Sequence, residues 1–308
     1  MNRQHGMQGG RSMRFWNFGA VMTAVALATT VAAQTMSPDD VDKLPASAPT
    51  LTSAYGSDAN QSGDLRLPAG KGPFPVVIVV HGGCWTKGYA TRRSTAALAS
   101  ALTAKGFATW NIDYRMLGGG GGWPTTFQDW AAATDHLRTL AKTQPLDLTR
   151  VAVTGHSAGA HAALWIAARS RLPKASAIRG ADPLPIRAAV AIDGPGDLAP
   201  FIGFDAQVCG MPVIVPLMGG TPAAVPQRYA EGTPAALLPL GVAQGLVASE
   251  VLQPAAAEAY RATAAGKGDS VAVLNVSNGG HFDIIAPGST AWTQVEPFLV
   301  KALTVPAK

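Results

Sequence analysis

Short apolar runs alternate with segments of helical periodicity along most of this chain. Residues 74–83 (FPVVIVVHGG) form a nearly continuous β-branched run, which is typical of a parallel strand buried on both faces. Residues 91–106 (TRRSTAALASALTAKG) follow with apolar residues at helical spacing and a terminal glycine. Strands that alternate with helices in this way predict right-handed crossovers and a mostly parallel sheet with helices on both faces, which is the α/β class.

The same alternation continues toward the C-terminus. Further strands are expected at 107–115, 150–155, 186–193, 241–248 and 270–277, and further helices at 126–142, 157–170, 255–266 and about 290–303. Residues 194–240 are rich in Pro and Gly and interrupt the pattern. Ligand crevices of such sheets lie outside the carboxyl ends of the strands. We therefore expect one catalytic domain over residues 55–308, with 194–240 as a small cap over that edge.

The first 33 residues differ from the rest. Arg11 and Arg14 precede the apolar stretch FWNFGAVMTAVALATTV, and the small residues Val31 and Ala33 follow. A basic, then apolar, then small-residue order is typical of a secretory signal peptide. The alternative is an uncleaved membrane anchor, for which the apolar run would have to span about 30 Å. We expect cleavage after Ala33, a secreted or periplasmic protein without stable membrane association, and a flexible mature N-terminus over 34–54.

Composition restricts the classes of function. The chain is 47% hydrophobic and 14% charged, which suits a large buried core. Without residues 1–33 it has 21 basic and 19 acidic side chains, and no Lys/Arg run is interleaved with aromatics, so nucleic acid is not an expected partner. Cys84 and Cys209 are expected to be free, with a bridge left as the alternative in an oxidising compartment. No HExxH or CxxC spacing occurs, so no metal or other cofactor is expected.

A serine stands between two glycines where a predicted strand meets a predicted helix. Residues 155–159 read GHSAG, which fits the GxSxG pattern in its informative context. Such a tight turn leaves no room for a Cβ at Gly155 or Gly159. It holds the Ser157 hydroxyl at a helix N-terminus, where the macrodipole favours developing negative charge. Ser157 is therefore the candidate nucleophile, and an ordinary serine N-cap with glycines by chance is the alternative.

A second motif, HGGCW at residues 81–85, follows the first strong strand. Acyl transfer needs backbone N–H groups directed at the oxyanion, and Gly82 and Gly83 allow the main chain to approach a substrate closely. The HGGG loops of lipases and esterases act together with the amide of the residue after the nucleophile, here Ala158. Cys84 stands where such loops have a third glycine, and Trp85 beside it is a candidate for substrate binding.

The general base should come after the last strand. His281 lies there, in the glycine-rich stretch NGGHFDII. An acid should accept the proton on Nδ1 of this histidine and stabilise the imidazolium. Glu250 follows the preceding strand in VASEVLQP and is the first choice. Asp193, at the end of 186–193, is the alternative, and Asp197 or no acid at all stays open.

From about residue 74 to residue 303 the chain resembles α/β-hydrolases of the esterase and arylformamidase-like group. The resemblance is carried by HGGCW, GHSAG and four further stretches, namely NIDYR (111–115), GGGWPTTFQDW (120–130), GGTPAAVPQRYAEGTPAALLPLG (219–241) and GGHFDIIAP (279–287). It implies the α/β-hydrolase fold, Ser157 as nucleophile, His281 as base, and backbone donors at Gly83, Cys84 and Ala158.

The acid is where this chain departs from that group. The group usually has a glycine-bounded loop with an aspartate after the seventh strand, whereas this chain has the shorter ASEVLQP. We interpret the difference as a deletion that leaves Glu250 in place of the aspartate.

The expected function is a secreted serine hydrolase, carboxylesterase-like, that cleaves esters of small or moderately apolar groups through an acyl-enzyme. Two alternatives stay open: an arylformamidase-like hydrolase of amides or formamides, and a non-catalytic binding protein on the same scaffold.

Overall fold

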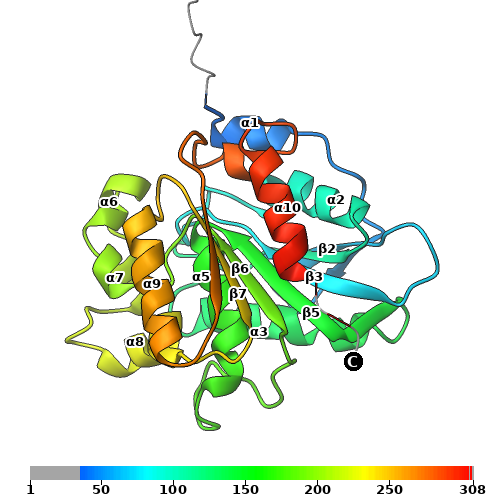
Figure 1. The fold of residues 1–308 in the computed structure, drawn as a ribbon. Coiled ribbons are helices and arrows are strands. Elements are labelled where there is room, and N and C mark those ends of the chain that lie inside the picture. The colour runs from blue at the N-terminus through cyan, green and yellow to red at the C-terminus, as the bar shows by residue number, and fades with distance from the viewer. Residues whose placement is uncertain (1–34, 305, 307–308) are drawn as a thin grey trace, which may run out of the picture. The chain divides into compact units, whose positions relative to one another are not determined.

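A sheet of eight strands forms the centre of the computed structural model, which describes residues 35–304 and 306 (Figure 1). The signal-peptide prediction lies outside the described residues. The spatial order is β1-β2-β4-β3-β5-β6-β7-β8. Strand β2 runs antiparallel to both of its neighbours, β1 and β4, and the six strands from β3 to β8 are parallel to one another. The strands are β1 (Leu51–Ala54), β2 (Ser62–Arg66), β3 (Phe74–Val80), β4 (Ala108–Ile112), β5 (Leu146–His156), β6 (Ala188–Ile192), β7 (Ala243–Ala248) and β8 (Val271–Asn275). The predicted α/β class with a mostly parallel sheet is confirmed.

Helices cover both faces of this sheet (Figure 1). One face packs against α1 (Pro38–Lys43), α2 (Ala96–Ala104) and α10 (Trp292–Leu303), and the other against α3 (Thr125–Asp135), α5 (Ala158–Ala168) and α9 (Pro254–Gly266). Strand β3 is apolar on both faces. Val77 and Val79 pack with the helices of the first face, while the alternate residues Val76, Ile78 and Val80 pack with those of the second. All five are fully buried, as expected where both faces of a strand with a two-residue period are covered.

Among the described residues, no helix is both long enough and apolar enough to cross a bilayer. The shorter helical elements outside the cap are α4 (Leu137–Leu140), η1 (Arg92–Thr95), η2 (Arg169–Arg171) and η5 (Asp283–Ile285). Because α4 is separate from α3, the single helix predicted over 126–142 is divided, and the two pieces meet at His136.

The N-terminal stretch 34–54, expected to be flexible, contains α1 and β1. Ser37 and Asp40 form a capping box at the start of α1, and Val41 is 2% exposed in the cluster with α2 and α10. Strand β1 pairs with β2, so the sheet begins before residue 55. Neither strand contains a β-branched run, and β2 pairs with β4, which is distant in sequence.

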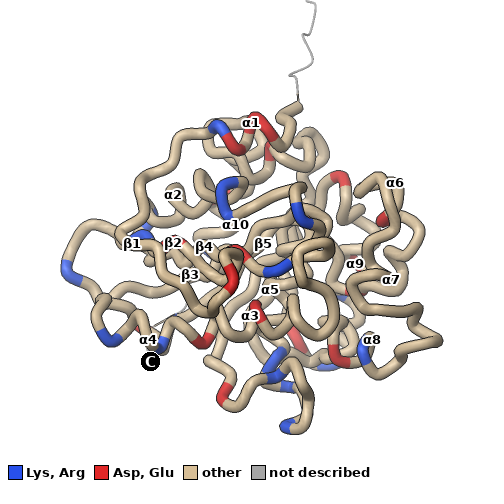
Figure 2. Tube along the Cα trace, turned by 180° about the vertical axis from the view of Figure 1, so that it is seen from behind, with Lys and Arg blue, Asp and Glu red and all other residues tan. Residues whose placement is uncertain are grey.

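The cap predicted over 194–240 consists of short helices. They are η3 (Ala199–Phe201), α6 (Phe204–Cys209), α7 (Ile214–Met218), α8 (Pro226–Gly232) and η4 (Pro234–Leu237). Residues 198–227 have a single charged side chain, Asp205, and in Figure 2 the trace around α6 and α7 is almost entirely uncharged. The Asp205 carboxylate accepts the backbone N–H groups of Val213 (2.8 Å) and Ile214 (2.9 Å). It thereby joins α6 to the start of α7.

Candidate active site

Ser157 stands at the turn from β5 into α5. Its backbone has φ 57° and ψ −120°, a left-handed conformation that costs about 1–3 kcal/mol and persists only where the surroundings enforce it. A Cβ on Gly155 would lie 2.1 Å from the Gly159 carbonyl oxygen, and a Cβ on Gly159 would lie 2.1 Å from the carbonyl oxygen of Val80. Both glycines are therefore required sterically, as the sequence predicts.

The loop after β3 lies against this turn. A Cβ on Gly82 would be 2.8 Å from the His156 carbonyl oxygen and 2.9 Å from Cβ of Ser157, so only glycine permits this approach. In the described part of the chain, the backbone N–H groups of Cys84 and Ala158 donate no hydrogen bond to the protein. Two unpaired donors beside one hydroxyl are what an oxyanion hole needs.

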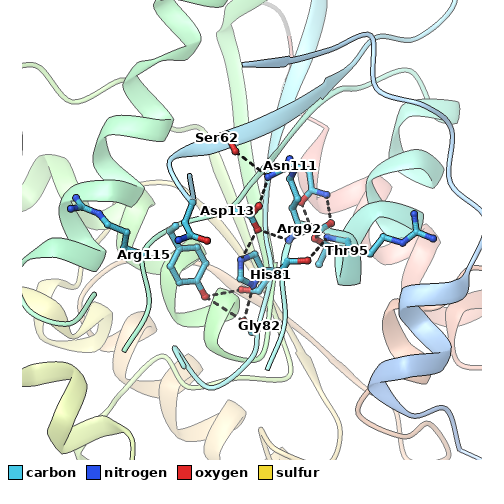
Figure 3. Close-up of polar contacts among 12 residues, drawn as sticks. Ser62, His81, Gly82, Arg92, Thr95, Asn111, Asp113 and Arg115 are labelled. Carbon is cyan, nitrogen blue, oxygen red and sulfur yellow. Dashed lines mark hydrogen bonds and ion pairs between the residues drawn. The ribbon is translucent and has the colours of Figure 1, made fainter. Parts of the chain in front are cut away.

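A buried polar cluster holds the first residues of this loop (Figure 3). Tyr114 donates to the His81 carbonyl oxygen (3.1 Å), and the rings of these two residues stack 4.6 Å apart. The His81 ring lies 2.9 Å from the Gly82 carbonyl oxygen through Nδ1 and 3.3 Å from Asp113 through Nε2. Asp113 also pairs with Arg92. Burial acts to raise the pKa of Asp113, but hydrogen bonds and charges from His81 and Arg92 outweigh it and lower that pKa.

The acid beside the histidine is Asp193, which directly follows β6. Its Oδ2 lies 2.7 Å from Nδ1 of His281. The same carboxylate accepts backbone N–H groups from the loop after β7, donated by Ser249 (3.0 Å), Val251 (3.1 Å) and Leu252 (2.7 Å). Burial acts to raise the pKa of Asp193, but the hydrogen bond and charge of His281 and the backbone donors outweigh it and lower that pKa. The carboxylate form is therefore stabilised at the ring.

The prediction that Glu250 contacts the ring of His281 is wrong. Glu250 accepts the backbone N–H of His281 instead, at 2.9 Å, and lines a separate cavity of about 470 Å³ at the carboxyl ends of β7 and β8. The shortened loop after β7 supplies amide donors to Asp193 rather than an acid. Of the residues weighed from the sequence, the alternative Asp193 is the one in contact with the ring.

His156, the residue before Ser157, contacts His281 through both its ring nitrogen and its ring face. Its Nε2 lies 2.8 Å from the His281 carbonyl oxygen, and the two rings are 4.2 Å apart. Burial, together with the neighbouring charge of His281, lowers the pKa of His156 to about 3. A neutral ring with its proton on Nε2 fits this contact, because that nitrogen then donates to the carbonyl oxygen.

Ser157 and His281 are not hydrogen-bonded to each other within the described residues. The Nε2 atom of His281 is the nitrogen that the Asp193 contact leaves open. Hydrogen bonds between a catalytic nucleophile and its base are often long in a site without substrate, and they shorten when the substrate binds.

Cys84 and Cys209 form a disulfide, so the expectation that both are free is wrong. Their sulfur atoms are 2.00 Å apart and their Cα atoms 6.0 Å apart. They are separated by 125 positions along the chain, and only the folding of the cap over the sheet edge brings them together. A count of two cysteines carries no such information.

The pocket at Ser157 lies between the sheet edge and the cap. It is about 20 Å³ in volume and is lined by Cys84, Trp85, Ser157, Ala158, Pro195, Phe201, Asp205, Val208, Cys209, Ile214 and Val251. Trp85, a candidate for substrate binding, is 3% exposed, and its Nε1 has no hydrogen-bond partner among the described residues. The lining is mostly apolar and half of it comes from the cap.

Comparisons with known proteins agree with this architecture. The family model described as BD-FAE matches residues 64–238, more than half of the chain. The chain belongs to the BD-FAE family. Its fold is similar to that of a carbohydrate esterase from gut microbiota, in a truncated form, with a TM-score of 0.67 and 18% identity over 83% of this chain and 97% of that one.

Two further solved structures resemble this BD-FAE member. Esterase B from Lactobacillus rhamnosis has a TM-score of 0.69 and 16% identity, covering 86% of this chain and 90% of its own. An acetyl ester-xyloside bifunctional hydrolase from Caldicellulosiruptor lactoaceticus has a TM-score of 0.65 and 15% identity, covering 82% and 95%. No curated protein matches. At these identities the likeness establishes the fold, and the α/β-hydrolase resemblance is confirmed.

Proposed function

We propose that this BD-FAE family member is a serine hydrolase that cleaves carboxylic esters through an acyl-enzyme. The observation that carries the proposal is the meeting of three parts at one edge of the sheet. Ser157 occupies a strained turn, the N–H groups of Cys84 and Ala158 beside it are unpaired, and His281 contacts a buried carboxylate.

Each group has a role in this chemistry. Ser157 Oγ attacks the ester carbonyl carbon while Nε2 of His281 takes its proton, and Asp193 holds the tautomer that leaves Nε2 open. The N–H groups of Cys84 and Ala158 stabilise the oxyanion, and Gly83, at φ 90°, allows the turn that precedes Cys84. His281 then gives the proton to the leaving alcohol, and a water molecule cleaves the acyl-enzyme by the same steps.

The size of the pocket favours a short acyl group. A volume of about 20 Å³ leaves room for about one or two water molecules, so a short acyl group such as acetyl requires the least movement of the lining side chains. Phe201 also lines a second, mostly apolar cavity of about 170 Å³. The carbohydrate esterase and the acetyl ester-xyloside hydrolase of similar fold support an alcohol part of sugar type.

Export forms part of the same proposal. Residues 1–33 have the composition of a signal peptide, and the Cys84–Cys209 disulfide suits a periplasmic or extracellular location, because such bonds persist in oxidising compartments.

The test is hydrolysis of p-nitrophenyl esters from acetate to decanoate, and of acetylated xylo-oligosaccharides, by the mature chain. We expect the acetate to be preferred and Ser157→Ala to reduce kcat at least about 10⁴-fold. Ser170→Ala, at an exposed position after α5, is the matched control and should keep full activity.

Other outcomes would select another function. Cleavage of anilide or formanilide analogues at rates above those of the esters would assign an amide hydrolase. Absence of turnover on all of these substrates, together with no covalent adduct between Ser157 and a phosphonate, would favour a binding protein.

A further inference from the structure

The one disulfide of the described chain joins two parts of the pocket wall. Cys84 belongs to the loop after β3 and Cys209 is the last residue of α6 in the cap. Both line the pocket at Ser157, and they are 8% and 7% exposed. The backbone N–H of Cys84 is also one of the two unpaired donors beside the nucleophile. The bond is therefore attached directly to a residue of the proposed oxyanion hole.

The loop needs such a restraint because its backbone is strained. Cys84 has φ 53° and Trp85 has φ 52°, and residues other than glycine hold this conformation only where the surroundings enforce it. Upstream, Tyr114 fixes the loop through the carbonyl oxygen of His81. The disulfide is the covalent restraint at the strained residues themselves.

The segment after β3 and the end of α6 are also joined by a hydrogen bond. The Tyr89 hydroxyl donates to the Cys209 carbonyl oxygen at 2.8 Å, although the Tyr89 side chain is 46% exposed. A single partly buried hydrogen bond makes only a modest net contribution to stability, while two residues of the loop are strained. The hydrogen bond alone is a weak replacement for the disulfide.

We propose that the Cys84–Cys209 disulfide is a positioning element for the oxyanion loop, so that ester hydrolysis is slower in the reduced chain than in the oxidised chain. The inference rests on the proposed function, since it assigns the bond to that reaction. The chain then becomes fully active only where the disulfide can form.

Reduction is a two-electron step. A dithiol such as dithiothreitol supplies two electrons and two protons, the Sγ–Sγ bond breaks to give two cysteine thiols, and the reagent becomes its cyclic disulfide. The chain contains only these two cysteines, so the reagent has no other protein target.

The experiment measures kcat and KM for p-nitrophenyl acetate with the mature chain before reduction, in dithiothreitol, and after reoxidation. Loss of one oxyanion donor costs about 10²–10³-fold in kcat. Because the Cys84 N–H is displaced rather than removed, we expect kcat to fall at least about tenfold with KM changed less than about threefold, and to recover on reoxidation. Far-UV circular dichroism at the assay temperature checks that the reduced chain stays folded.

Two double variants separate positioning from strain. Cys84→Ala with Cys209→Ala should match the reduced wild type in kcat and should not respond to dithiothreitol. Cys84→Gly with Cys209→Ala relieves the left-handed backbone strain without restoring the restraint, and it should stay at least about tenfold below wild type. Unchanged kcat in the reduced, folded wild type would overturn the proposal, whether or not the variants fold.

A readout independent of activity distinguishes this failure from failure of the proposed function. Amide hydrogen exchange should accelerate on reduction in residues 81–90 and 204–213, while β3 and β5 stay protected. Unchanged exchange in both segments, or a uniform increase over the whole chain, would contradict the positioning role even in a chain that cleaves no ester.

Discussion

The two halves of the candidate active site are held in different ways. On the nucleophile side, Ser157 is fixed by the tight turn between β5 and α5 and by the close approach of that turn to the end of β3. On the histidine side, His281 is held by three groups far apart in sequence, namely Asp193 after β6, Glu250 after β7 and His156 before the nucleophile. Steric exclusion of a Cβ positions the first half, and a polar network positions the second.

On the histidine side, the largest effect is expected from the isosteric change Asp193→Asn. The backbone donors after β7 would keep the Asn oxygen, so its NH₂ group would face Nδ1 of His281. The ring would then carry its proton on Nε2 and could not accept the proton of Ser157. We expect kcat for p-nitrophenyl acetate to fall about 10³–10⁴-fold, which is about 4–5.5 kcal/mol.

The control for this change is Asp197→Asn, four residues further along at a half-buried position. It removes the same charge near the same strand and should leave kcat within about threefold of wild type. Wild-type activity in Asp193→Asn would show that the acid in contact with the ring is not needed and that the polar network does not position His281 for catalysis.

The next largest effect concerns the nucleophile side and is one of stability. In Gly159→Ala the new Cβ would meet the Val80 carbonyl oxygen at 2.1 Å, so β3 and α5 would have to move apart. We expect a loss of about 3 kcal/mol or more in the free energy of unfolding, measured by urea titration. Gly266→Ala at the end of α9, where nothing lies within 4 Å of the new Cβ, is the matched control and should be neutral or slightly stabilising.

This contrast explains what the sequence can and cannot predict. The turn at Ser157 is predictable because the GxSxG spacing, between a strand and a helix, is itself a sequence signal, and the buried strands because β-branched runs carry their own signal. The Asp193–His281 contact and the Cys84–Cys209 bond join residues 88 and 125 positions apart. The expectation of Glu250 rests on the chain order of the α/β-hydrolases that the sequence resembles. Nothing within VASEVLQP indicates that the backbone amides of this loop, rather than the Glu250 carboxylate, face the site.

A smaller effect is expected from Glu250→Gln. The Gln side-chain oxygen can still accept the His281 N–H, now 2.9 Å from Glu250, but without charge, so the hydrogen bond weakens while the ring keeps Asp193. We expect kcat to fall by about tenfold or less, with the pH profile of kcat/KM unchanged in shape. A loss as large as that of Asp193→Asn would mean that the two carboxylates act as one unit, and a double variant would then show strong non-additivity.

The smallest effect is expected on the nucleophile side, where the stability of the folded chain depends on pH through His161. His161 on α5 lies 2.7 Å from the Gly232 carbonyl oxygen through Nε2, and burial lowers its pKa to about 4. The unfolded chain, with a histidine pKa near 6.5, binds the proton first as the pH falls. The stability contributed by the neutral ring is therefore fully present above about pH 6.5 and is lost progressively between about pH 6.5 and 4.

Replacing His161 by Gln keeps an N–H donor for the Gly232 carbonyl but removes this titration. The free energy of unfolding of the wild type should fall more steeply with acid than that of His161→Gln, by up to about 1.4 kcal/mol per pH unit between pH 6 and 4.5. Urea titrations at half-unit intervals measure both slopes. The pKa of Asp193 is lowered in the folded chain, so the stability that its carboxylate contributes is lost only at pH values below this range. Parallel slopes in the two proteins would mean that His161 is protonated in the folded chain, and α5 would then have to accommodate a charge beside the nucleophile.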